Sequence, residues 1–337
     1  MPELRKDPIS GTWVLISPER TDRPTDFGKE LAPPSRSGDC PFCPGNEAMT
    51  PPEVLAFPKT GKKWQVRVVP NKYPAVTSGG VADRLGEGLF QGLAGVGIHE
   101  VVIESPDHGA TLATLPESAV EDVLRAYQSR FHAIEKGGRF PYVLIFKNHG
   151  PEAGATLEHG HSQLVALPFV PPRARQELDG ALAHFSRENR CIYCDIIDEE
   201  EDGPRFVSGN DDFVVLTPFA SRFAWEVWLL PRRHRARFGE ATEAEGSGLA
   251  RALKQTLTSL DRALGLPPPY NFIVQSAPFC EDVDAHYHWH IEIAPRLTRL
   301  AGFEWATGAY INPTPPEEAA RKLRQIMQLA SSGRSKA

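Results

Sequence analysis

The sequence contains no long uninterrupted run of apolar residues, either at its start or further along its 337 residues. A secretory signal needs an apolar stretch of roughly 7–15 residues, and a membrane-spanning helix needs about 20. We therefore expect neither a signal peptide nor a membrane span, and we expect a cytoplasmic location.

Blocks of like charge are also missing from the sequence. The chain has 37 Lys and Arg against 43 Asp and Glu, which gives a formal net charge of −6. Nucleic-acid grooves and surfaces that bind anionic membranes need clustered Lys and Arg. The sequence therefore predicts a globular protein with no nucleic-acid partner and no membrane partner.

Cysteine is scarce, with five residues in the chain, but four of these form two Cys-x-x-Cys pairs. The pairs are Cys40 with Cys43 and Cys191 with Cys194. In a chain without a secretory signal, such pairs indicate metal or redox sites rather than structural disulfides. We interpret the remaining Cys280 as a small, partly buried residue.

The two halves of the chain repeat four motifs in the same order, which indicates an ancestral unit used twice. The third motif of each half contains an apolar run, and the final motif has His at its first and third positions and Pro at its tenth. The repeated pairs are CPFC (40–43) and CIYC (191–194), HEVVIESPDH (99–108) and WEVWLLPRRH (225–234), PYVLIFKN (141–148) and PYNFIVQS (269–276), and HGHSQLVALP (159–168) and HYHWHIEIAP (286–295).

Each half combines extended segments with one long amphipathic segment. Apolar residues recur at three-to-four spacing in residues 116–136 and 242–264, which predicts one helix in each half. Segments such as 64–71 and 99–108 are predicted strands. Because the strands follow one another with the helix outside the alternation, we expect an α+β fold, a mainly antiparallel sheet with helices packed on it.

The proline-rich segment 167–176 is the predicted boundary between the two units. We therefore expect an N-terminal unit of residues 1–170 and a C-terminal unit of residues 171–337. A last helix is predicted after Thr314, which can act as its N-cap, with proline in the first turn.

A Cys-x-x-Cys pair with two distant histidines suits tetrahedral Zn²⁺ held by two thiolates and two imidazoles. A redox dithiol or simple buried thiols are the alternatives, but the repetition of the whole set favours two structural zinc sites. The first set is Cys40, Cys43, His108 and either His159 or His161; the second is Cys191, Cys194, His234 and one of His286, His288 and His290.

If His159 completes the first metal site, His161 remains free on the same face of a strand. A neutral imidazole is a competent nucleophile toward phosphorus, and a metal-bound neighbour would hold its strand in place. Gln163 can donate its amide hydrogens to a phosphoryl oxygen as charge develops. The alternative for His161 is a hydrogen-bonded core histidine.

Two further segments favour a phosphate ligand, each weakly. The loop of residues 147–156 contains two glycines, an Asn and a Thr, and can present backbone N–H groups to an anion. Arg20 and Arg23 follow an apolar strand and could bind phosphate, although two solvated arginines are an equal alternative.

Seven segments of the sequence resemble the galactose-1-phosphate uridylyltransferase family of the histidine-triad superfamily, whose members carry two such units. The resemblance implies two tandem histidine-triad-like units, a homodimer, and ping-pong nucleotidyl transfer through a covalent nucleotidyl group on His161. The segments are ISPERTDRP, CPFCPGNE, VRVVPNKYPA, ESPDH, FKNHGPEAGAT, HGHSQ and GFEWATGAYINPTPPEEAA.

The same resemblance implies roles for individual residues. It assigns Cys40, Cys43, His108 and His159 to the first zinc, and Cys191, Cys194, His234 and His288 to the second, with His286 and His290 as rivals of His288. It assigns His161 and Gln163 to catalysis, and Arg20, Arg23, Asn71, Asn148, Gly154, Thr156 and Ser162 to the nucleotide and its phosphates.

The substrate is less clearly indicated than the family. We expect transfer of UMP between UDP-glucose and a hexose 1-phosphate. However, galactose-handling members have His-Pro-His-Gly-Gln where this chain has Gly160 and Ser162, and usually Asn-Asp where it has Asn71 and Lys72. These features resemble ADP-glucose phosphorylase, an adenylyl-transferring relative that uses ADP-glucose and phosphate.

Two other classes of function compete with the transferase. A histidine-triad hydrolase would pass the nucleotidyl group to water, and a zinc-stabilised nucleotide-binding protein would have no chemistry. The second half has Trp289 and His290 where the first has Ser162 and Gln163. This asymmetry indicates one active site per chain, which favours the enzyme.

Overall fold

The computed structural model describes residues 2–20, 40–58 and 63–334. The strands are β1 (Glu3–Lys6), β2 (Trp13–Ile16), β3 (Leu55–Phe57), β4 (Val66–Pro70), β5 (Arg84–Leu85), β6 (Gly92–Leu93), β7 (Ile98–Ile103), β8 (Tyr142–His149), β9 (His161–Leu167), β10 (Phe206–Gly209), β11 (Phe213–Leu216), β12 (Val227–Pro231), β13 (Tyr270–Gln275), β14 (His290–Pro295) and β15 (Tyr310–Asn312). The α-helices are α1 (Glu117–Gly137), α2 (Pro172–Glu188), α3 (Ile192–Glu201), α4 (Glu243–Leu264), α5 (Gly302–Thr307) and α6 (Pro316–Arg334). Short 3₁₀ helices are η1 (Pro18–Arg20), η3 (Glu47–Met49), η4 (Pro151–Ala153) and η5 (Phe238–Glu240).

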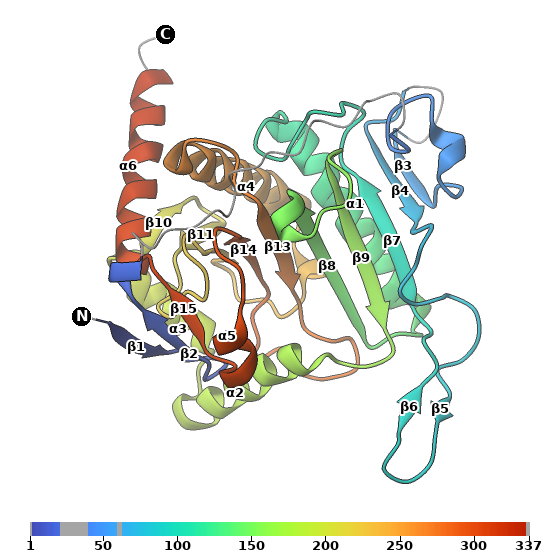
Figure 1. Ribbon diagram of the computed structural model, residues 1–337, viewed down its shortest axis with the longest axis horizontal. Helices are drawn as coiled ribbons and strands as arrows, with labels where there is room; N and C mark the ends of the chain where they lie inside the picture. Colours follow the sequence, from blue (N-terminus) through green and yellow to red (C-terminus); the bar gives the residue numbers. More distant parts are fainter. Residues whose placement is uncertain (1, 21–39, 59–62, 335–337) are drawn as a thin grey trace.

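A ten-stranded antiparallel sheet runs through the molecule in the order β10-β11-β12-β14-β13-β8-β9-β7-β4-β3. From the central pair β13–β8, the strands follow in corresponding order on both sides, as the repeated motifs predict (Figure 1). The predicted α+β fold is confirmed. Because β13 and β8 pair directly, the two halves share one sheet, and the division at residue 170 stays a prediction.

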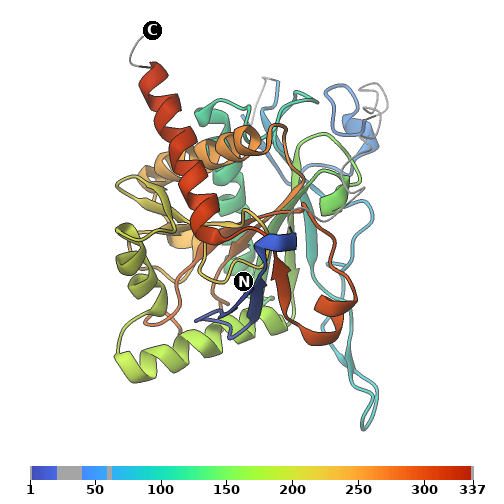
Figure 2. The same cartoon turned by 60° about the vertical axis from the view of Figure 1, so that its left-hand side comes forward.

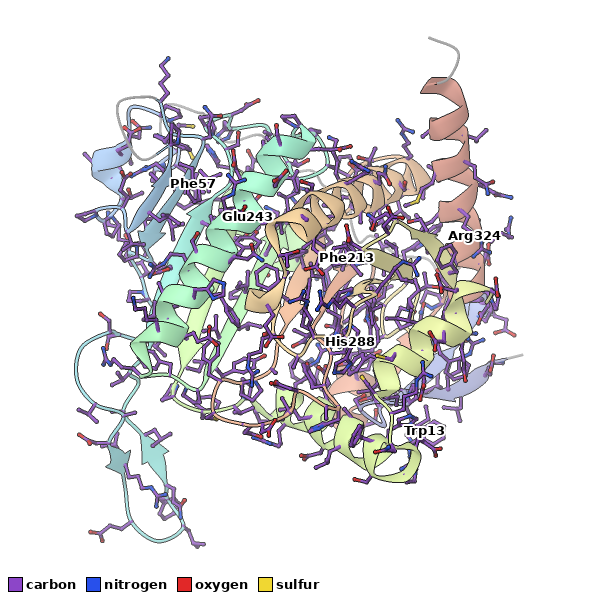
Figure 3. All side chains as sticks on the ribbon, turned by 180° about the vertical axis from the view of Figure 1, so that it is seen from behind. Trp13, Phe57, Phe213, Glu243, His288 and Arg324 are labelled. Atoms are coloured by element: carbon purple, nitrogen blue, oxygen red, sulfur yellow. The ribbon has the colours of Figure 1, made fainter. Side chains whose placement is uncertain are left out.

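Helices α1 and α4 pack against each other over one face of this sheet, and α4 also contacts α6 (Figures 1 and 3). Helix α4 begins as the sequence predicts, because Thr242 accepts from the Glu245 backbone N–H while the Glu245 carboxylate accepts from that of Thr242. This reciprocal pair satisfies two N–H groups that a helix start leaves without partners. Helix α4 ends at Gly265, whose φ of 78° is the left-handed conformation that favours glycine.

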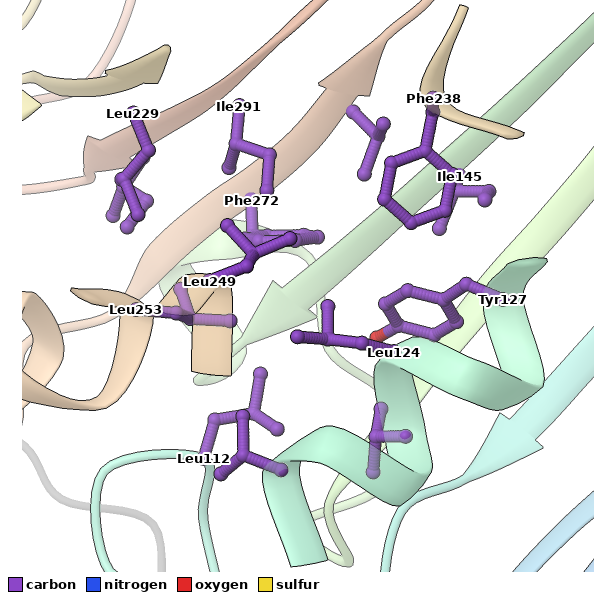
Figure 4. Close-up of a cluster of buried hydrophobic side chains, with 14 of the residues drawn as sticks. Leu112, Leu124, Tyr127, Ile145, Leu229, Phe238, Leu249, Leu253, Phe272 and Ile291 are labelled. Atoms are coloured by element: carbon purple, nitrogen blue, oxygen red, sulfur yellow. The ribbon is translucent and has the colours of Figure 1, made fainter. Parts of the chain in front are cut away.

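The main hydrophobic core lies between the sheet and these helices. Along β9, Leu164 and Ala166 face the core, while the residues between them face the other side. Figure 4 shows Phe272 and Ile291 from the sheet beside Leu253 of α4; each of the three is 0% exposed. One face of the sheet therefore packs in the hydrophobic core, and the opposite face of β9 can carry polar groups.

Two strands near the N-terminus and one from residues 310–312 form a second, small sheet. Strand β2 pairs with β1 and, in parallel, with β15 (Figure 2). No helix within residues 2–20, 40–58 and 63–334 is both long and apolar enough to cross a membrane.

Two local predictions differ from the structure. Strands β7 and β12 end at Ile103 and Pro231, so His108 and His234 lie in the loops that follow rather than in strands. The expected linker is largely helical, because α2 begins at Pro172. Proline is favoured at a helix start, where its missing N–H would have no partner anyway.

Truncating the core residue Leu253 to Ala should lower the free energy of unfolding by about 2–5 kcal/mol, because it removes buried methyl groups and leaves a cavity. Leu329→Ala on α6 is the matched control, because Leu329 is 72% exposed; its cost should be within about 0.5 kcal/mol. Urea denaturation of both variants measures the difference. Equal losses in the two variants would contradict the described core.

Candidate active site and metal-binding groups

Two groups of cysteine and histidine come together in the structure, one in each half. In the first, the ligand atoms of Cys40, Cys43, His108 and His159 all lie within 4.8 Å of one another. His108 Nδ1 is 3.3 Å from Cys43 Sγ, and His159 Nδ1 is 3.6 Å from both sulfurs. A tetrahedral ion with bonds of about 2.0–2.3 Å separates its ligands by about 3.3–3.8 Å. The spacing therefore fits one metal ion.

The second group repeats this arrangement with Cys191, Cys194, His234 and His288. Cys191 precedes α3 and Cys194 lies in its first turn, where Cys194 Sγ is 3.3 Å from His234 Nδ1 and 3.7 Å from His288 Nδ1. The structure thus brings His288 to the two cysteines, rather than either of its neighbouring histidines.

Backbone carbonyl groups determine which ring nitrogen these histidines turn toward the sulfurs. His159 Nε2 lies 2.8 Å from the Ser105 carbonyl oxygen, and His288 Nε2 lies 2.8 Å from that of Pro231. Because a carbonyl oxygen only accepts, each Nε2 carries the proton and each Nδ1 has a free lone pair. A neutral ring held in this way is suited to coordinate a metal through Nδ1.

Cys43→Ser and Cys194→Ser should each reduce the bound metal from two ions per chain to one, because each removes a ligand from a different group. Burial and the neighbouring Cys40 raise the pKa of Cys43 to about 11, an effect that a bound cation reverses by stabilising the thiolate. Elemental analysis of the purified protein measures the content.

Cys280→Ser is the matched control, since Cys280 is exposed, not partly buried as predicted, and is outside both groups. It should retain both ions. Two bound ions per chain in Cys43→Ser or in Cys194→Ser would contradict the metal-binding role of the group that the substitution changes.

His161 opens β9 two residues after His159 of the first cysteine–histidine group. Its Nδ1 donates to the His159 carbonyl oxygen at 2.8 Å, so Nε2 is left with a lone pair. The ring is 8% exposed and packs on Phe42 of the first Cys-x-x-Cys motif, with the ring centroids 5.3 Å apart. Burial, together with the Lys147 ammonium, lowers the pKa of His161. The ring is therefore neutral at neutral pH, as a nucleophile requires.

Several predicted nucleotide contacts lie near this histidine. Gln163 follows His161 on the same face of β9, and its Oε1 is 2.8 Å from His99 Nε2. Asn71 Nδ2 is 3.1 Å from the same His99 atom. On the neighbouring strand β8, Asn148 also lies on this face. The structure thus brings the amides of Gln163, Asn71 and Asn148 to one side of the sheet.

The remaining predicted phosphate contacts are only partly located by the structure. Gly154 has a φ of 92°, and a Cβ built on it would be 3.5 Å from Asn148 Nδ2, so glycine is favoured there. Thr156, in the same loop, and Arg20, in η1, are exposed. Their contacts with a nucleotide stay predictions, and Arg23 lies outside the described residues.

The structure changes the correspondence between the two histidine motifs. Alignment by sequence pairs the metal ligand His159 with His286, but His288 occupies its place in the second metal group. His290 then corresponds to His161, because it opens β14 and its Nδ1 donates to the His288 carbonyl oxygen at 3.1 Å. The repeat is therefore shifted by two residues.

With this shift, Glu292 rather than His290 occupies the place of Gln163. Arg173 donates to both carboxylate oxygens at 2.6 and 2.7 Å, and Arg222 lies 3.1 Å away. Burial alone would raise the pKa of Glu292, but these two arginines hold it well below its usual range. A fixed carboxylate there would repel a phosphate, so the second half lacks the catalytic arrangement. A third group that could hold a metal ion consists of Glu177, His290 and Glu292. However, the Glu292 carboxylate already binds Arg173 and Arg222.

The chain is similar to known proteins over nearly its whole length. A model described as galactose-1-phosphate uridyl transferase, N-terminal domain, matches residues 1–171, and one for a domain of unknown function (DUF4921) matches residues 125–336. ADP-glucose phosphorylase of Arabidopsis thaliana is 35% identical over 331 residues, covering 96% of this chain and 93% of that protein. The chain belongs to the galactose-1-phosphate uridylyltransferase family.

Other members of the family agree with this assignment. The galactose-1-phosphate uridylyltransferase of Thermotoga maritima is 31% identical over 333 residues, covering 96% of this chain and 98% of that protein. A crystal structure of the Arabidopsis ADP-glucose phosphorylase with bound ADP-glucose has a TM-score of 0.85 at 33% identity, covering 96% of this chain and 99% of that one. A uridylyltransferase structure has a TM-score of 0.77 at 33% identity, covering 98% of this chain and 99% of that one. As a member of this family, the chain is a nucleotidyltransferase.

The side chain of Ser162 does not lie where a phosphate contact in this uridylyltransferase-family chain would require it. Its side chain is fully buried on the core face of β9, where it donates to Glu104 and lies 2.5 Å from the Tyr127 hydroxyl. Alternation along β9 turns the Ser162 side chain away from His161 and Gln163. The contact of this residue with the nucleotide stays a prediction, which the buried side chain does not support.

Sequence reasoning missed the ion pair that completes this cluster. Lys147 and Glu104 are each 1% exposed, and Lys147 Nζ donates to Glu104 at 2.8 Å and to the His161 carbonyl oxygen at 3.1 Å. The pair thus fixes the backbone of His161 from the core face of the sheet. Strand alternation in residues 99–104 could have indicated that Glu104 faces inward, but nothing in the sequence identifies its partner.

Lys147→Met should lower the free energy of unfolding by about 3–5 kcal/mol, because it leaves the Glu104 carboxylate buried without its cation. The double variant Lys147→Met/Glu104→Gln should be more stable than the single variant. Urea denaturation measures both.

Lys322→Met on α6 is the matched control, since Lys322 and Glu318 form a pair that is 46% and 45% exposed. Its cost should stay below about 1 kcal/mol. A Lys147→Met loss no larger than this would rule out the stabilising role of the buried pair.

Proposed function

We propose that the chain transfers a nucleoside monophosphate between a nucleoside-diphosphate hexose and a hexose 1-phosphate through a covalent intermediate on His161. The observation that carries the proposal is the fixed tautomer of His161, whose Nδ1 donates to the His159 carbonyl and whose Nε2 lone pair is free. The Gln163 amide on the same face supports the reaction by stabilising charge on the phosphoryl oxygens.

In the first step, His161 Nε2 attacks the α-phosphorus, the new N–P bond forms, and the bond to the sugar 1-phosphate oxygen breaks. This leaving group is already a phosphate of low pKa, so it needs no general acid. In the second step, an oxygen of the acceptor phosphate attacks the same phosphorus and His161 leaves. Water must be excluded meanwhile, which separates a transferase from a histidine-triad hydrolase.

We propose zinc as the metal of both cysteine–histidine groups, with a structural role. Two thiolates and two imidazoles leave no open position on a tetrahedral ion, and zinc bound there would supply rigidity rather than a Lewis acid. His159 is a ligand two residues before the nucleophile, so the first site would hold the start of β9 in place.

We propose UDP-glucose as the nucleotide sugar, and hence uridylyl transfer. The second candidate is adenylyl transfer from ADP-glucose to phosphate. It is favoured by the 35% identity to ADP-glucose phosphorylase and by the residues Gly160, Ser162 and Lys72, which depart from the galactose-handling pattern. The homodimer and the cytoplasmic location stay predictions, and a non-catalytic nucleotide-binding protein is the remaining alternative.

Brief incubation of the metal-loaded protein with UDP-glucose should increase its intact mass by one UMP, measured by mass spectrometry. His161→Ala should give no increase, because it removes the attacking nitrogen. His132→Ala is the matched control, since this surface histidine on α1 contacts only Glu135 among the described hydrogen-bond partners, and it should form the adduct normally.

The same experiment with ADP-glucose separates the two candidates. An AMP adduct without a UMP adduct would assign the adenylyl reaction. If neither sugar nucleotide modifies the wild-type protein, the covalent mechanism is wrong, and nucleotide hydrolysis or binding becomes the function to test.

A further inference from the structure

His99 contacts the catalytic amide from the neighbouring strand. Strands β7 and β9 pair with Val101 opposite Gln163, and His99, two residues earlier, lies on the same face. Its Nε2 is 2.8 Å from Gln163 Oε1. His99 and Gln163 are both only half-buried, so this pair borders the open side of the site.

A backbone donor fixes the tautomer of His99. The Ala75 N–H donates to His99 Nδ1 at 3.0 Å, so Nδ1 has no proton. In the neutral ring the proton is then on Nε2, which donates to Gln163 Oε1. The donor and acceptor roles in this pair therefore follow from a main-chain hydrogen bond.

This bond also selects the orientation of the Gln163 amide. With Oε1 held by His99, the NH₂ group is on the side of the amide away from His99, and no described residue accepts from it. Rotating the amide by half a turn would place a second NH₂ group, beside that of Asn71, against His99 Nε2–H, and this N–H would then have no acceptor among its described partners. Without His99, the Gln163 amide could equally turn its oxygen toward a phosphate group. The amide oxygen and the negatively charged phosphate would then repel each other.

We propose that His99 is a positioning residue that orients the Gln163 amide so that its N–H groups face the α-phosphate. The inference rests on the proposed nucleotidyl transfer and adds a residue to it. His99 itself does not touch the reacting atoms and acts through Gln163.

The same histidine connects Gln163 to the predicted nucleotide-contacting segment. Asn71 backbone N–H donates to the His99 carbonyl oxygen at 2.8 Å, and Asn71 Oδ1 accepts from the Tyr73 N–H at 2.9 Å. The Asn71 NH₂ group therefore lies beside His99 Nε2, at 3.1 Å. Since Nε2–H is directed to Gln163, Asn71 does not donate to this nitrogen, and Gln163 Oε1 is its acceptor among the described partners.

In the second half of the chain, the residues that correspond to His99 and Gln163 both differ from them, which supports the pairing of these two residues. Trp228 pairs with Glu292 as Val101 pairs with Gln163, so Glu226 occupies the place of His99. Glu226 and Glu292 both bind Arg222, at 2.5 and 3.1 Å. Where the catalytic amide is lost, its histidine donor is lost as well, and an arginine bridges two carboxylates instead.

Substitutions of His99 can separate its two hydrogen bonds. In His99→Gln the amide nitrogen can reach the place of Nε2 and donate to Gln163, whereas in His99→Asn the shorter side chain can replace only Nδ1. We expect kcat for nucleotidyl transfer to fall about tenfold to a hundredfold in His99→Asn, less than the roughly 10²–10³-fold cost of losing a whole transition-state donor. KM for the nucleotide sugar should change less than about threefold, because the lost interaction acts mainly in the transition state.

His99→Gln should restore most of the rate, and His132→Asn on the surface of α1 should leave it unchanged. In a Gln163→Ala background, His99→Asn should cause no further loss, because the residue that it positions is absent. An equal loss in both backgrounds, or no recovery in a folded His99→Gln protein, would overturn the inference.

Nitrogen NMR of histidine-labelled wild-type protein gives a readout that does not depend on activity. The His99 signals, assigned by their loss in His99→Gln, should show a protonated Nε2 and an unprotonated Nδ1. The reverse tautomer overturns the inference even if the enzyme is active. Absence of any nucleotidyl adduct in the wild type overturns the proposed function, and the role of His99 with it.

Discussion

The site depends on hydrogen bonds from histidine rings to main-chain carbonyl groups. The Ser105 carbonyl oxygen accepts from His159 Nε2–H, so His159 Nδ1 faces the cysteines, while the His159 carbonyl oxygen accepts from His161 Nδ1–H, so His161 Nε2 keeps a free lone pair. Two histidines only two residues apart thus present different atoms, Nδ1 of His159 toward the cysteines and Nε2 of His161 as the proposed nucleophile. Since the backbone of β9 fixes both carbonyls, any change in its pairing would alter both functions together.

Strand β9 is held from both of its faces. On the open face, Phe42 packs on the ring of His161. On the core face, Lys147 binds the His161 carbonyl and Glu104, and Ser162 joins the same cluster. A buried ion pair rarely adds much stability compared with apolar residues, but it imposes a geometry that apolar packing does not. Here the geometry it fixes is that of the nucleophile's main chain.

The sequence is sufficient to predict the α+β class, the helices α1, α4 and α6, and the two Cys-x-x-Cys pairs as the centres of two metal-binding groups, because spacing and periodicity act locally. It is not sufficient for features that depend on strand register. Three alternating histidines at 286, 288 and 290 allow two alignments with His159 and His161, and only the pairing of β14 selects one. The burial of Ser162 and the contact of His99 with Gln163 likewise require knowing where β9 begins and which strand lies beside it.

The direct pairing of β13 with β8 has a consequence for the second half of the chain, which lacks the catalytic arrangement. Without β13, strand β8 would become the border of the sheet, and its main-chain N–H and C=O groups would be open to pairing with other chains. The second half therefore serves the first as a cover for an aggregation-prone edge. Its strands fulfil this role whatever side chains their polar face carries, because main-chain pairing with β8 does not depend on the arginine–glutamate cluster.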